Sequence, residues 1–160
     1  INNPNKIKDP EILRFGIFMH DIVNGSPNDV EDSVEIALKL LHKSENSKFK
    51  NKENLLREII LATKHDSSVP ENLSLEAKII ADIDLSILGS DKSSYNIYAK
   101  QIRREYSRYP DDVYNPGRIA VLKGILIKHN IYKTDFFQKK YEQKARINIQ
   151  NEIDFLAGNN

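Results

Sequence analysis

The sequence contains no cysteine, which excludes disulfide bonds, thiolate catalysis and zinc sites built on cysteine. We therefore predict a cytoplasmic location. No apolar run approaches the ~20 residues needed to cross a bilayer, and no signal-peptide pattern opens the chain. The first residue is Ile1 and not methionine, so we expect that sequence preceding it has been removed or left out.

Charge is distributed unevenly along the 160 residues, although the formal net charge is only +1. Residues 1–91 contain 11 basic and 16 acidic side chains, a net of −5, whereas residues 92–160 contain 13 and 7, a net of +6. This asymmetry favours cation ligands in the first half and anion-binding groups in the second. The alternative is that these charges lie on solvated helix faces. The length suits one domain, and we predict that residues 1–160 form a single domain.

Apolar residues recur at helical spacing, and the chain has no convincing strand pattern, internal repeat or low-complexity tract. The first helix should begin at Asp9-Pro10-Glu11, because an N-cap acid followed by proline favours a helix start. The further helices are expected over residues 30–41, 55–62, 75–88 and 95–109, in a segment opened by residues 115–118, and over residues 137–153. These patterns predict an all-α bundle of about seven helices.

The apolar run at residues 15–19 ends in His20 followed directly by Asp21. An imidazole beside a carboxylate offers one nitrogen and one oxygen ligand, which suits Mn, Fe, Co, Ni or Zn. The alternative is a hydrogen-bonded core histidine near a helix end. The spacing alone does not decide between the two.

A second unusual feature is a pair of aspartates, Asp82 and Asp84, within the apolar helix predicted over residues 75–88. Carboxylates are rarely buried without partners. Residues two apart cannot share one face of a helix, so at least one of the two should point into the core or a lined cavity.

A series of further fragments follows in a fixed order along residues 15–152. The fragments are Phe18-Met19-His20-Asp21, Glu31-Asp32-Ser33, Thr63-Lys64-His65, residues 82–89, Tyr98 with residues 102–106, Gly117-Arg118, residues 131–134, and Glu142 with residues 145–148. The ordered set resembles the HD-domain superfamily of metal-dependent phosphohydrolases. It is most similar to the small bacterial branch described as predicted HD phosphohydrolases.

The resemblance implies a divalent metal ion, with Mn, Co, Fe, Ni, Zn and Mg all left open. It implies His20, Asp21 and Asp84 as ligands, with Asp82 and His65 in reserve. Relatives carry another ligand histidine upstream of the His-Asp pair, and no histidine precedes His20 here. Either that histidine lies in a removed N-terminal helix or the protein lacks it, and the present chain is expected to bind metal less tightly.

The resemblance also implies metal-assisted hydrolysis of a phosphoester. Glu31 is then the candidate for positioning or deprotonating the attacking water, with a helix-start acid as the alternative. The candidate phosphate clamps are Lys64, Arg103, Arg118 and Arg146. At least one of these cations is expected to pair with Glu105 or Glu142 instead.

Two hypotheses remain open at this point. The first is a phosphohydrolase acting on a nucleotide or another small phosphorylated substrate. The second is a non-catalytic helical module with an eroded metal site that serves binding or assembly. Because the basic half has no recognition motif, we expect no nucleic-acid partner. We also expect no membrane partner, and we leave a homo-oligomer open.

Overall fold

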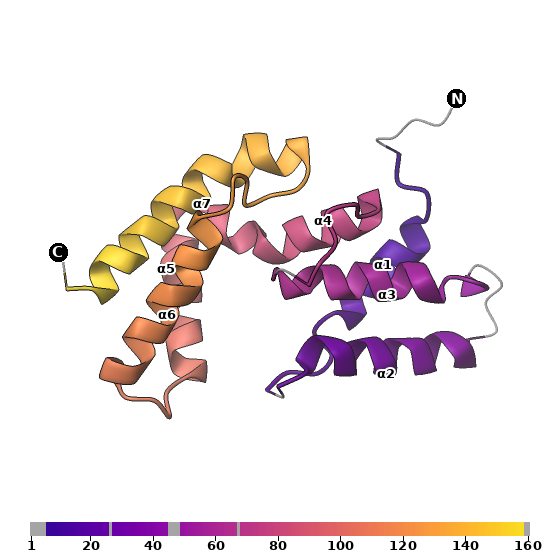
Figure 1. Cartoon of the computed structure of the whole chain (residues 1–160), viewed down its shortest axis with the longest axis horizontal. Coiled ribbons are helices and arrows are strands. Elements are labelled where there is room, and N and C mark those ends of the chain that lie inside the picture. The colour runs from indigo at the N-terminus through magenta and orange to yellow at the C-terminus, as the bar shows by residue number, and fades with distance from the viewer. Residues whose placement is uncertain (1–5, 26, 45–48, 67, 159–160) are drawn as a thin grey trace. The chain divides into compact units, whose positions relative to one another are not determined.

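The computed structural model describes residues 6–25, 27–44, 49–66 and 68–158 (Figure 1). Within these residues the chain is helical and has no strand, so the prediction of an all-α fold with about seven helices is confirmed. The chain divides into two compact units, Ile1–Asp84 and Leu85–Asn160. The prediction of one domain over residues 1–160 stays a prediction. No helix of the described residues is long and apolar enough to cross a membrane.

The first unit is built around a central buried helix. Its elements are α1 (Pro10–Met19), α2 (Asp29–Lys43), α3 (Glu53–Leu61), the 3₁₀ helix η2 (Ala62–Lys64) and α4 (Leu75–Asp84). Helix α3 contacts α1, α2 and α4, and its residues Leu56, Ile59 and Ile60 are fully buried. Burial of these side chains, together with the rest of the core around them, stabilises the unit. It also fixes the three helix ends that carry the candidate site.

Helix α1 begins and ends where the sequence predicts. The Asp9 carboxylate accepts a hydrogen bond from the Ile12 amide at 3.3 Å, and Pro10 occupies the first turn. The helix ends at Met19, with His20 as its C-cap. The His20-Asp21 pair therefore lies at a helix end, as predicted.

The second unit is organised along its last and longest helix. Its elements are the 3₁₀ helix η3 (Leu85–Gly89), α5 (Lys92–Glu105), α6 (Asp111–Leu126) and α7 (Asp135–Leu156). Helix α7 contacts η3, α5 and α6. The core of the second unit includes Tyr132, Leu122 and Ile149, all fully buried.

Two predicted helix boundaries in this region are wrong. The helix predicted over residues 75–88 keeps α-helical geometry only to Asp84 and continues as 3₁₀ helix from Leu85 to Gly89. Helix α6 begins at Asp111 and not at residue 115, so Pro116 lies inside it. The acids in its first turn favour the earlier start. Pro116 cannot donate one backbone hydrogen bond within the helix.

Gly89 is required by the close approach of η3 to α7. A Cβ on Gly89 would lie 2.8 Å from the Tyr141 carbonyl oxygen and 3.0 Å from the Tyr132 hydroxyl. We expect Gly89→Ala to lower the free energy of unfolding by about 1–3 kcal/mol, because the Tyr141 backbone cannot rotate away. Gly124→Ala is the control, since its Cβ would meet open space. Equal urea-denaturation midpoints for the two variants would contradict this close contact.

Candidate metal centre

His20 presents one ring nitrogen outward from the end of α1. Its Nδ1 lies 2.8 Å from the Ile17 carbonyl oxygen. A carbonyl only accepts, so Nδ1 carries the proton in this contact, and Nε2 is the nitrogen available to a metal or an acid. A backbone hydrogen bond on the opposite ring nitrogen is typical of metal-ligating histidines. Nε2 lies 3.6 Å from Asp84 Oδ1.

His65 reaches the same carboxylate from the end of η2. Its backbone is left-handed, with φ 57°, a conformation that a residue with a Cβ rarely adopts. Such strain is stored where the surrounding structure requires a particular side-chain direction. The imidazole Nε2 lies 2.7 Å from Asp84 Oδ2. His65, which the sequence predicts as a reserve ligand, is therefore in direct contact with Asp84, the favoured ligand.

Asp84, the last residue of α4, lies between the two imidazoles. Burial opposes its charged form, but the interactions with His20 and His65 outweigh burial and bring its pKa down to about 2. The pKa of His20 is raised, chiefly by its interaction with Asp84 and against the effect of burial. The cluster is thus an ionised carboxylate held by two imidazoles from different elements.

The pKa shifts predict a pH-dependent stability in the presence of a chelator. The raised pKa of His20 stabilises the folded state below pH 6.5, and this stabilisation is lost as pH rises through the folded-state pKa. The lowered pKa of Asp84 stabilises the folded state above pH 3.8, and this stabilisation is lost as pH falls toward about 2. Urea denaturation across this range should show both losses. Asp84→Asn should flatten both, and parallel profiles for variant and wild type would contradict the assignment.

The other two predicted aspartates lie in contrasting environments. Asp21 is exposed, and its charge adds to the raised pKa of His20. Asp82 is 0% exposed. One of the two helix aspartates is therefore in the core, as the two-residue spacing requires, and Asp84 is the one that meets the histidines.

Glu31 and Lys64 form an ion pair in the same unit. The Lys64 ammonium lies 2.6 Å from Glu31 Oε1, and Lys64 directly precedes His65. This hydrogen bond lowers the pKa of Glu31 and raises that of Lys64. Both side chains also line a cavity of about 670 Å³ whose walls include Val34, Leu61 and other residues of α2, α3 and the segment that follows.

The arginines predicted as phosphate clamps belong to the second unit and are bound there. Arg103 donates to Asp111 at 2.8 Å, and Arg118 donates to Glu152 at 2.8 Å. Arg146 pairs with Glu142, the structural alternative of the sequence analysis, and donates to three backbone carbonyls. Their role in phosphate binding stays a prediction.

The donor set suits a divalent cation of the borderline transition series. Two imidazole nitrogens and a carboxylate converge, and the orientation of His20 is fixed by Ile17. In their present arrangement, no three His, Asp or Glu side chains of the described residues form a complete metal site. The residues fit the ion by chemistry, and the direct Asp84–histidine contacts would have to open to admit it.

Comparison with known proteins gives one result. A family model described as HD domain matches residues 2–86, which is more than half of the chain. The match covers the first unit except for its first residue and ends two residues beyond Asp84. No curated protein and no solved structure matches the chain significantly.

Proposed function

Because this chain belongs to the HD domain family, whose members are in general divalent-metal-dependent phosphohydrolases, we propose that it hydrolyses a phosphoester of a nucleotide or another small phosphorylated substrate. The observation that supports the proposal most directly is the Asp84 carboxylate between the Nε2 atoms of His20 and His65. We include a cytoplasmic location in the proposal, on the strength of the absence of cysteine.

In this proposal the cation is held by His20, Asp21 and Asp84, with His65 as a further donor. When bound, a divalent cation polarises a phosphoryl oxygen and lowers the pKa of water toward neutrality. The protein contributes orientation: Ile17 holds the ring of His20, and the strained backbone of His65 keeps its imidazole at Asp84. The contact with Ile17 reduces the reorganisation needed on metal binding, whereas the contact between His65 and Asp84 has to open.

Glu31 positions the attacking water and accepts its proton. Its lowered pKa keeps it ionised at neutral pH, so it is ready to accept a hydrogen bond from water. Lys64 holds Glu31 in place and brings one positive charge that a phosphate group requires.

The cavity beside this ion pair supports a substrate larger than inorganic phosphate. Its volume of about 670 Å³ lies in the range of small-molecule sites, which are mostly apolar with few polar groups. Val34 and Leu61 supply apolar wall, and Lys64 supplies a cation at the edge. A nucleotide combines the apolar and anionic parts that such a lining binds.

The decisive experiment is a substrate panel on protein reloaded with Mn or Co after mild chelation. We expect hydrolysis of at least one nucleotide or phosphomonoester, in proportion to measured metal content. Activity that is independent of metal content would contradict the proposal. A fully metallated protein with no activity over a broad panel would favour the binding module, the alternative that the incomplete donor grouping also fits.

A further inference from the structure

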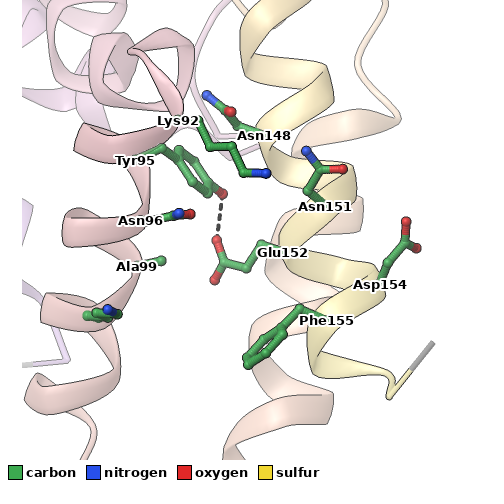
Figure 2. A pocket seen from close by; sticks show the side chains of 10 residues that line it. Lys92, Tyr95, Asn96, Ala99, Asn148, Asn151, Glu152, Asp154 and Phe155 are labelled. Atoms are coloured by element: carbon green, nitrogen blue, oxygen red, sulfur yellow. Dashed lines mark hydrogen bonds between the residues drawn. The ribbon is translucent and has the colours of Figure 1, made fainter. Parts of the chain in front are cut away.

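The second unit contains a pocket between α5 and α7 that the proposed reaction does not use. Its volume is about 440 Å³, within the range of small-molecule sites. Figure 2 shows side chains of both helices facing each other across it, with Lys92 reaching from α5 toward α7. All of its lining residues belong to the second unit.

The floor of the pocket is a closed hydrogen-bond network. The Tyr95 hydroxyl donates to Glu152 Oε2 at 2.5 Å (Figure 2), and burial and Glu152 together raise the pKa of Tyr95. Arg118 binds the same carboxylate through Nε at 2.8 Å. Glu152 is 9% exposed, and Arg118 compensates its charge. The floor is therefore rigid and adds no net charge.

The α5 wall carries an excess of positive charge. Lys92 and Lys100 both line the pocket, and neither forms an ion pair with any residue that the structure describes. Eight helical positions separate them, a span of about 12 Å. On the opposite wall Asp154 contributes one negative charge and accepts a hydrogen bond from Gln150, and Asn151 presents a neutral amide. Since Arg118 compensates Glu152, the two lysines and Asp154 leave the lining with a net charge of +1, and the pocket favours an anionic ligand.

An aromatic ring lies at the other end of the pocket. Phe155 is 67% exposed, and its ring borders the pocket (Figure 2). A planar ligand group packed on this ring would remove apolar surface from water. The Asn151 amide offers both a donor and an acceptor to the edge of such a group.

We propose that the pocket between α5 and α7 binds a nucleoside phosphate. The phosphate lies between the ammonium groups of Lys92 and Lys100, and the base packs on Phe155. The ligand class follows from the combination of cations, amides and one exposed ring in a cavity of this size. The site shares no residue with the candidate metal centre and does not depend on the proposed hydrolysis.

Isothermal titration of the whole chain with adenosine, guanosine, cytidine and uridine monophosphates tests this site. A chelator is included so that no metal is available to the first unit. We expect binding by wild type, and a loss of ~5- to 100-fold in affinity for Phe155→Ala, the range of base stacking on an aromatic side chain. The double variant of Lys92→Ala and Lys100→Ala should weaken binding at least tenfold and reduce its salt dependence. Equal melting temperatures of variants and wild type establish that the fold is kept.

Matched controls separate this pocket from other sites. Phe136→Ala, also exposed on α7, and Lys139→Ala lie outside the lining and should bind like wild type. Asp84→Ala should also bind like wild type. Binding lost in Asp84→Ala but kept in Phe155→Ala would overturn the proposal, as would the absence of binding by wild type. Equal affinity for inorganic phosphate, or binding of single-stranded RNA without binding of mononucleotides, would overturn the ligand class.

Discussion

Replacing Asp84 with alanine is expected to abolish metal loading and, with it, hydrolysis. The carboxylate contacts both His20 and His65, so its loss removes an oxygen ligand and the anchor of two imidazoles. The remaining imidazoles and Asp21 would supply one carboxylate fewer to compensate the charge of a divalent cation. Bound Mn or Co should fall from near one ion per chain to background.

The measurement is elemental analysis after reloading, together with urea denaturation in a chelator. Asp84→Ala should remain folded, because the carboxylate is 33% exposed and its desolvation cost is lost with it. Asp112→Ala, an exposed acid of the second unit, is the control and should load like wild type. Full loading of folded Asp84→Ala, with loss in Asp82→Asn, would transfer the ligand role to Asp82.

Local features of the first unit could be predicted from sequence because they depend on neighbours along the chain. The cap at Asp9, the proline at the first turn and the apolar spacing determine where α1 begins. The alternation of Asp82 and Asp84 between faces follows from helix geometry alone. The placement of His20 at a helix end required no tertiary information.

The contact between His65 and Asp84 depends on information that the sequence does not display. It requires a left-handed backbone at a residue that rarely adopts one, 19 positions away from its partner. Nothing in Thr63-Lys64-His65 indicates that conformation. The signal that was present is the histidine itself, directly after a lysine and a threonine at a helix end.

The arginines of the second unit show the same difference between contacts that the sequence predicts and contacts that it does not. Arg146 and Glu142 are four residues apart on one helix, a spacing at which ion pairs form, so their pairing could be anticipated. Arg118 and Glu152 are 34 residues apart and meet only because α6 packs on α7. A guanidinium in a sequence is therefore a candidate phosphate clamp until its structural partner is known.

Glu31→Gln is expected to reduce turnover by ~100- to 10,000-fold while leaving metal content unchanged. The amide oxygen of glutamine can still accept a hydrogen bond from Lys64, so the contact at 2.6 Å is largely preserved. What is lost is the ionised carboxylate that accepts the proton of the attacking water. The Michaelis constant should change much less than kcat, because Glu31 does not hold the substrate in this mechanism.

Glu53→Gln is the control for Glu31→Gln, since Glu53 is another partly exposed glutamate of the first unit, paired with His42. Rates at saturating substrate, with metal measured in the same samples, separate the outcomes. A fall in metal content with Glu31→Gln would make Glu31 a ligand. A fall in turnover of less than tenfold would leave Glu31 only the role of holding Lys64. The Lys64→Ala variant then decides between these roles, because it frees Glu31 without removing the base. A large fall in kcat with Lys64→Ala and a small fall with Glu31→Gln would assign the catalytic contribution to the lysine. That result would contradict the role of Glu31 as the base.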